Sequence, residues 1–105
     1  MLQTTKRPAS NEPLFNLGQL VMTAGIYELV SEGLFSPAPF LARHQAGDWG
    51  EICREDWIRN NRSLNQDPEQ RGRLFSVFST PDGTKIWIIT EWDRSVTTIL
   101  LPDEY

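Results

Sequence analysis

Cysteine and histidine are scarce in this sequence, which has one of each, Cys53 and His44, among 105 residues. One cysteine cannot form an internal disulfide or a cysteine-based metal cluster, and it suits a reducing compartment. No segment reaches the roughly 18 consecutive apolar residues of a membrane span, and no charged-then-apolar leader opens the chain. We therefore expect a cytoplasmic protein with no membrane association.

The familiar catalytic motifs are also missing. The sequence has no glycine-rich phosphate loop, no G-x-S-x-G elbow and no H-E-x-x-H pair. We interpret Cys53 as a residue that fills core space, and His44 as a helix-end residue bonded to the turn at Gly47–Trp49. We expect no cofactor, no metal and no enzymatic activity. The net charge of −4 disfavours a nucleic-acid partner, because binding phosphates requires a cationic surface.

The best-defined part of the chain is its last third, which predicts three strands. Leu74–Thr80, Lys85–Trp92 and Val96–Leu101 are short and rich in β-branched and aromatic residues. The Pro-Asp-Gly sequence after Thr80 predicts a tight hairpin, and a second polar reversal precedes Val96. Along the middle strand, Trp87 and Trp92 fall on opposite faces. At least one of these two indoles is therefore expected to be partly exposed or covered by something other than the helices.

The first half of the chain predicts a tail, a strand and three helices. Residues 1–13 are polar and predict a flexible tail, and Phe15–Met22 predicts a strand in which Gly18 marks a bulge or a close backbone approach. Helix signals then appear in three places: Thr23 to Gly33, Ser36-Pro37 to Gly47, and a capping box at Asp48–Glu51 that opens a helix to about Asn65. Asp56 and Asn60 fall inside the apolar stripe of the third helix, so their polar groups need partners.

The predicted element order is β-α-α-α-β-β-β. The simplest arrangement is a single α+β domain over residues 14–105, with a four-stranded antiparallel sheet covered on one face by helices.

A cluster of polar residues at the end of the middle strand is the main candidate for a site. Glu91, Asp93 and Arg94 lie next to Trp92, and they could either contact a partner or form an internal ion pair that fixes the last turn. An exposed tryptophan among polar residues is typical of an interface. The predicted interaction surface comprises Trp87, Trp92, Glu91, Asp93, Arg94, His44 and Asp48.

Two other functions remain open. Glu91 and Asp93 could serve a small metal-dependent hydrolase or nuclease, although turn roles already account for such residues. A nucleic-acid-binding regulator would use the cations of the chain, namely Lys6, Arg7, Arg54, Arg59, Arg62, Arg71 and Arg73.

Three stretches carry a family resemblance. They are His44-x-x-Gly47-Asp48-Trp49-Gly50, Asp82-Gly83-Thr84-Lys85-Ile86-Trp87-Ile88-Ile89-Thr90-Glu91, and Asp93-Arg94-Ser95-x-Thr97-Thr98-x-Leu100-Leu101-Pro102-x-Glu104-Tyr105. From Phe15 to Tyr105 the chain resembles a family of small bacterial proteins common on plasmids and integrated mobile elements. Its members are labelled plasmid-related protein or type I restriction subunit M, but this chain has no methylase cofactor loop.

The resemblance implies the company of mobile elements, where small acidic proteins often block host defence complexes. It assigns no catalytic residues. We therefore expect a non-enzymatic protein-interaction module, with inhibition of host restriction or CRISPR complexes as the activity that the resemblance implies.

Overall fold

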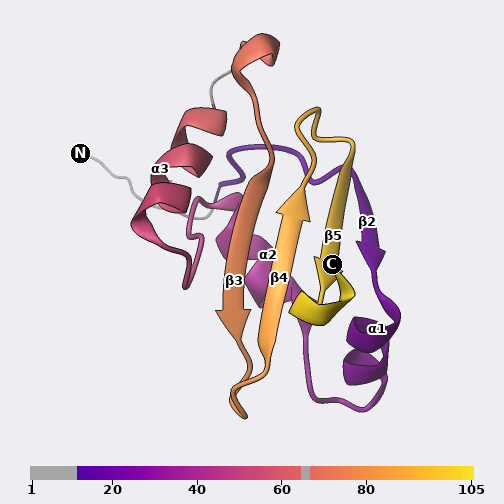
Figure 1. Cartoon of the computed structure of the whole chain (residues 1–105). Coiled ribbons are helices and arrows are strands. Elements are labelled where there is room, and N and C mark those ends of the chain that lie inside the picture. Colours follow the sequence, from indigo (N-terminus) through magenta and orange to yellow (C-terminus); the bar gives the residue numbers. More distant parts are fainter. Residues whose placement is uncertain (1–11, 65–66) are drawn as a thin grey trace, which may run out of the picture.

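The computed structural model describes residues 12–64 and 67–105, and over these residues it confirms an α+β fold (Figure 1). The predicted tail, residues 1–13, lies outside the described residues except for its last two positions. The elements are β2 (Gln19–Met22), α1 (Ala24–Ser31), α2 (Pro37–Gln45), α3 (Arg54–Ser63), β3 (Leu74–Ser79), β4 (Lys85–Thr90) and β5 (Val96–Leu100), with short 3-10 turns η2 (Pro68–Gln70) and η3 (Pro102–Glu104).

Strands β3, β4 and β5 form the antiparallel meander that the sequence predicts. Each ends one or two residues earlier than expected. The hairpin turn is closed by Asp82, whose carboxylate accepts hydrogen bonds from the Thr84 N–H at 3.2 Å and the Thr84 hydroxyl at 2.9 Å. Because this turn satisfies its own polar groups, the ladder stops before Thr80.

The expectation of a wholly antiparallel sheet is wrong, because β2 pairs with β5 in parallel. The sheet order is β2-β5-β4-β3, and the β2–β5 register runs from Gln19 opposite Val96 to Met22 opposite Ile99. The chain enters β2 beside the turn that precedes β5: Gly18 adopts φ +67°, and a Cβ there would lie 2.2 Å from the Ser95 carbonyl oxygen. This close approach, expected at Gly18, makes both strands start at the same end of the sheet.

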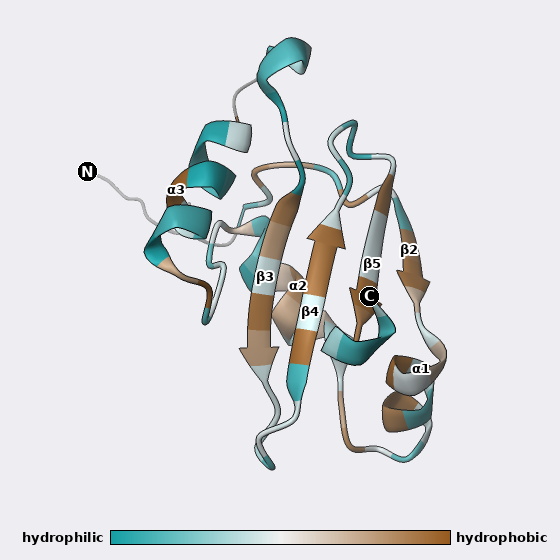
Figure 2. Cartoon of the chain, viewed as in Figure 1, coloured by the Kyte–Doolittle hydropathy of each residue, from teal (hydrophilic) through white to brown (hydrophobic). Residues whose placement is uncertain are grey.

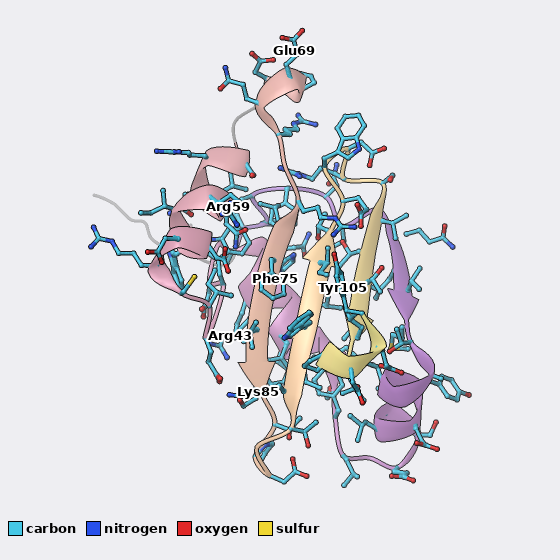
Figure 3. All side chains as sticks on the ribbon, in the orientation of Figure 1. Arg43, Arg59, Glu69, Phe75, Lys85 and Tyr105 are labelled. Carbon is cyan, nitrogen blue, oxygen red and sulfur yellow. The ribbon has the colours of Figure 1, made fainter. Side chains whose placement is uncertain are left out.

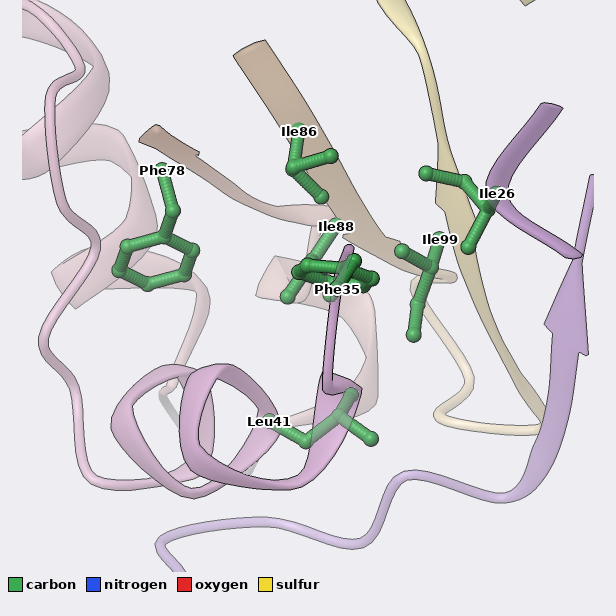
Figure 4. Packing of buried hydrophobic residues seen from close by; sticks show 7 residues of the cluster. All are labelled: Ile26, Phe35, Leu41, Phe78, Ile86, Ile88 and Ile99. Carbon is green, nitrogen blue, oxygen red and sulfur yellow. The ribbon is translucent and has the colours of Figure 1, made fainter. Parts of the chain in front are cut away.

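The core lies between the sheet and helices α1 and α2 (Figure 4). The buried cluster combines residues of both layers: Ile26, Phe35, Leu41, Phe78, Ile86, Ile88 and Ile99. In Figure 1, α2 lies behind the sheet and α3 lies beside β3. Figure 2 shows that α3 is hydrophilic over most of its length, in contrast to the strands.

The predicted capping box at Asp48–Glu51 is wrong, because these residues precede α3 and bond to β3 instead. The Glu51 N–H donates to the Val77 carbonyl at 2.8 Å, and the Val77 N–H donates to the Trp49 carbonyl at 3.1 Å. Gly50 (φ +75°) sits where a Cβ would lie 2.0 Å from the Val77 carbonyl oxygen. The segment pairs with β3 because doing so satisfies backbone groups that the edge strand would otherwise leave open.

Helix α3 therefore begins at Arg54. The expectation for Cys53 is wrong, and the expectation that Asn60 has hydrogen-bond partners is confirmed. Cys53 stands just before the helix and is exposed, so its interpretation as a core residue is wrong. Asn60 is buried and has the partners it needs: its amide donates to the Phe75 carbonyl at 2.7 Å and accepts from the Phe75 N–H at 3.1 Å. The predicted helix end near Asn65 lies outside the described residues. Among the described residues, no helix has the length and apolar character needed to span a bilayer.

Candidate interaction surface

The face of the sheet opposite α1 and α2 carries an open groove. Side chains alternate along the strands, so Phe75, Trp87 and Ile89 point away from the core, and the first and last are directly opposite each other in the ladder. We call this side the outer face. The groove on it has a volume of about 410 Å³ and is lined by Asp56, Arg59, Asn60, Arg73, Phe75, Trp87, Ile89 and Tyr105. Figure 3 shows Phe75 and Tyr105 on this side of the sheet, with Arg59 on the adjacent helix.

The rings of Phe75, Trp87 and Tyr105 form the floor and one wall of this groove, which we call the aromatic groove. The Phe75 and Trp87 ring centroids lie 5.1 Å apart at 87°, and the Trp87 and Tyr105 centroids lie 5.8 Å apart at 61°. These are edge-to-face contacts, which stabilise aromatic pairs beyond simple burial. Tyr105 remains 72% exposed and Trp87 is half-buried. The groove thus presents a ready-made aromatic surface to solvent.

The C-terminal residues hold Tyr105 over the sheet. The Glu104 carboxylate accepts from the Gly25 N–H at 2.8 Å, the Leu101 N–H at 2.9 Å and the Thr23 hydroxyl at 2.5 Å. These bonds tie η3 to the start of α1. Tyr105 follows directly, so its ring is placed by contacts that come from the other end of the domain.

The cations at the rim of the groove already have partners. Arg59 Nη1 lies 2.7 Å from Asp56 Oδ1, and Arg73 Nε lies 3.2 Å from Glu91 Oε1. Arg73 Nη1 also donates to the Tyr105 hydroxyl at 2.8 Å. The Tyr105 hydrogen bond and then Glu91 raise the pKa of Arg73. Because its charges are balanced locally, the groove suits an apolar or neutral group better than an anion.

Of the residues predicted for the interaction surface, Trp87 lies in this groove and Trp92 lies apart from it. Trp92 is 54% exposed, but β4 ends at Thr90, so Trp92 belongs to the β4–β5 turn rather than to a strand face. The two tryptophans therefore mark separate places on the surface.

Glu91 and Asp93 take structural roles in and beside that turn. Glu91 pairs with Arg73 as described above. Asp93 Oδ1 accepts from the Ser95 hydroxyl at 2.6 Å and from the Ser95 N–H at 3.1 Å, and the hydroxyl bond is the main cause that lowers the pKa of Asp93. Over the part of the chain that the structure describes, no group of three or more His, Cys, Asp or Glu side chains is arranged to hold a metal ion.

Arg94 ties the turn to the end of α3. Its Nη1 donates to the Gly72 carbonyl at 2.7 Å and its Nη2 donates to the Ser63 carbonyl. Nη1 also bonds the carbonyls of Glu91 and Trp92 at 3.2 and 3.1 Å. Burial is the main cause that lowers the pKa of Arg94. Its backbone has φ +61°, which is costly for a residue other than glycine. We conclude that Arg94 positions neighbouring segments.

His44 lies in a chain of buried hydrogen bonds that crosses three strands. Its Nδ1 is 2.5 Å from the Ser76 hydroxyl of β3, and its Nε2 is 2.9 Å from the Thr90 hydroxyl of β4. The Thr90 and Thr97 hydroxyls are 2.7 Å apart, and the Thr97 hydroxyl donates to the Leu17 carbonyl at 2.7 Å. The hydroxyls of Thr90 and Thr97 are thus part of an internal network.

The Leu17 carbonyl is the last acceptor in this series, and it determines which group donates in each of the hydrogen bonds. Thr97 gives its proton to a carbonyl, so Thr90 must donate to Thr97 and accept from His44 Nε2–H. Nδ1 is then unprotonated and accepts from Ser76. Burial, followed by the charge of Arg94, lowers the pKa of His44 from 6.5 to about 3. The ring is neutral and fully buried, so it cannot contact a partner and does not bond the turn after α2 through its side chain.

Asp48 lies away from the outer-face groove. Its Oδ2 pairs with Arg43 Nε at 2.7 Å and its Oδ1 accepts from the Gly50 N–H at 3.2 Å. His44, Asp48 and Arg94 therefore do not converge on the outer face. Each stabilises a different part of the domain.

Several groove residues were not singled out from the sequence. The alternation of the strands would have placed Phe75 on the face of Trp87, because both lie at odd positions of an antiparallel pair. Nothing local in the sequence places Tyr105 or the α3 side chains Asp56 and Arg59 beside them. Their convergence depends on where α3 and η3 lie against the sheet.

Compared with protein-family models, with curated proteins and with solved structures, the chain gives no match.

Proposed function

We propose that this chain is a non-enzymatic protein-interaction module that binds its partner in the aromatic groove, with Trp87 as the anchor. The observation that carries the proposal is the open aromatic floor formed by Phe75, Trp87 and Tyr105 on the outer face. Exposed aromatic side chains surrounded by polar groups are enriched at the centres of protein interfaces.

The chemistry of the groove favours a protein side chain as its occupant. Its cations are paired with Asp56 and Glu91, so a phosphate would have to displace an existing partner. Its lining includes the Tyr105 phenol but no serine, cysteine or histidine that could act as a nucleophile. An aliphatic or aromatic side chain of a partner protein would bury the indole and leave the rim ion pairs intact.

The resemblance to proteins of plasmids and mobile elements supports a partner in a host defence complex. In this proposal the chain inhibits a restriction or CRISPR complex by occupying a protein surface. It modifies neither the complex nor the DNA.

The test uses two tryptophan variants in the full chain. Expression of the wild-type chain is expected to raise the survival of an incoming plasmid in a host with intact defence systems, and the tagged chain should capture a stoichiometric partner. With that purified partner, Trp87→Ala should weaken binding at least about 10-fold, because central aromatic anchors dominate binding energy.

Trp92→Ala is the matched control, since Trp92 is also exposed but lies outside the groove. It should bind like the wild type, and circular dichroism should show both variants folded. The proposal is refuted if a folded Trp87→Ala protein keeps full affinity and full protection of the plasmid.

A further inference from the structure

The two edge strands of the sheet, β3 and β2, differ in whether their outward backbone groups have hydrogen-bond partners. The outward backbone groups of β3 are covered, because the Asn60 amide bonds both groups of Phe75 and the Trp49–Glu51 segment bonds both groups of Val77. A covered edge cannot add another strand.

The other edge strand, β2, has no such cover among the described residues. Gln19 donates its N–H to the carbonyl of Ser95, just before β5, at 2.8 Å, and Thr23 donates its N–H to the Ile99 carbonyl of β5 at 3.1 Å. Because bonding direction alternates along a strand, the N–H and C=O groups of Leu20 and Met22 point away from β5. Figure 1 shows β2 as the outermost strand, with no described element beyond it.

Apart from its shortness, this edge lacks the usual features that prevent strand addition. All four residues of β2 are exposed, and none is charged or proline. Leu20 is 44%, Val21 38% and Met22 36% exposed. Edge strands that must stay unpaired commonly carry lysine, proline or a bulge. The strand therefore offers both free backbone groups and apolar side chains.

The residues that follow β2 in sequence, and the η3 turn bonded to the start of α1, carry acidic side chains. The sequence has no lysine or arginine from position 8 to position 42. Glu28 is exposed on α1, which follows β2 closely, and Glu32 is exposed at the C-cap of that helix. Asp103 is exposed on η3, which is bonded to the start of α1. None of the three forms an ion pair with a cation of the described chain. A basic partner would meet complementary charge along this side.

We propose that β2 binds an extended, basic segment of a partner protein, which adds to the sheet as a fifth strand. Backbone hydrogen bonds to Leu20 and Met22 supply the pairing, and Glu28 and Glu32 select cations in the segment. A second copy of the chain fits less well, because it has the same acidic side and a net charge of −4. This site goes beyond the aromatic groove of the proposed function and is independent of it.

The test measures binding of short fluorescent peptides to the full chain by anisotropy. One peptide alternates valine and threonine with lysines at both ends, and a second has glutamates in place of the lysines. A third is the lysine peptide N-methylated at every valine and threonine, so that neither of its edges keeps N–H donors in this stretch. The lysine peptide should bind at least about 10-fold more tightly than the glutamate peptide, and added salt should weaken it. The N-methylated peptide should not bind, because it cannot complete the ladder.

Two variants locate the site. Leu20→Pro removes an N–H that β5 does not use, which edge strands tolerate, and it should abolish peptide binding in a protein that circular dichroism shows to be folded. Trp87→Ala should leave peptide binding unchanged. The experiment therefore distinguishes failure of the proposed partner binding in the aromatic groove from failure of the proposed peptide binding at β2. Equal binding of the lysine and glutamate peptides, no binding of the lysine peptide, binding that survives Leu20→Pro, or a dimer in sedimentation that Leu20→Pro dissociates would each overturn the proposal.

Discussion

The buried, neutral His44 makes the stability of this protein depend on pH in a window where few other groups titrate. Its pKa falls from 6.5 in the unfolded chain to about 3 in the folded protein. The unfolded chain therefore binds a proton that the folded protein rejects, and the free energy of unfolding falls as the pH decreases below 6.5. Above that value the contribution is constant.

The size of the effect follows from these two pKa values. Each pH unit between them costs about 1.4 kcal/mol, so the free energy of unfolding should fall by about 2 kcal/mol from about pH 7 to pH 5. The chain has one histidine, so we assign the slope over this range to His44. Protonation would place an N–H against Ser76, which now donates to that nitrogen.

Urea unfolding followed by tryptophan fluorescence measures this dependence. The matched variant is His44→Gln, which keeps a neutral polar side chain and removes the titrating group. It should unfold at a lower urea concentration than the wild type at about pH 7, yet lose less than about 0.5 kcal/mol on going to pH 5. If the wild-type stability is flat over this range, or if His44→Gln shows the same slope, the buried neutral ring is not its cause.

Two further predictions concern the cover of the β3 edge. Gly50→Ala should destabilise the fold by more than about 2 kcal/mol, because the new Cβ would meet the backbone of β3. Gly83→Ala, at a similar φ but in open space, should cost about 1–2 kcal/mol. Thermal melts that give equal losses of stability for the two variants would refute the steric argument. Asn60→Ala should cost about 1–3 kcal/mol and speed amide hydrogen exchange at Phe75, since both backbone groups of Phe75 lose their partner; unchanged exchange there would show that the amide does not protect this edge.

The parts of the fold that depend on neighbouring residues can be predicted from local sequence patterns. The three C-terminal strands follow from β-branched runs and the Pro-Asp-Gly turn, and Ser36 and Pro37 start α2 because proline suits the first helical position. The need of Asn60 for a partner was also visible, because its amide falls on the apolar stripe of α3.

The other features of the fold depend on contacts between distant segments, because the local signals for a helix cap and for strand pairing are of similar strength. Asp48 and Glu51 match a helix cap, but the open edge of β3 offers their segment two backbone bonds, which the sequence does not show. The parallel direction of β2 depends on the close approach of Gly18 to Ser95, which lies in a turn far away in sequence. The aromatic groove likewise joins β3, β4, α3 and the C-terminal residue, and no periodicity relates such distant positions.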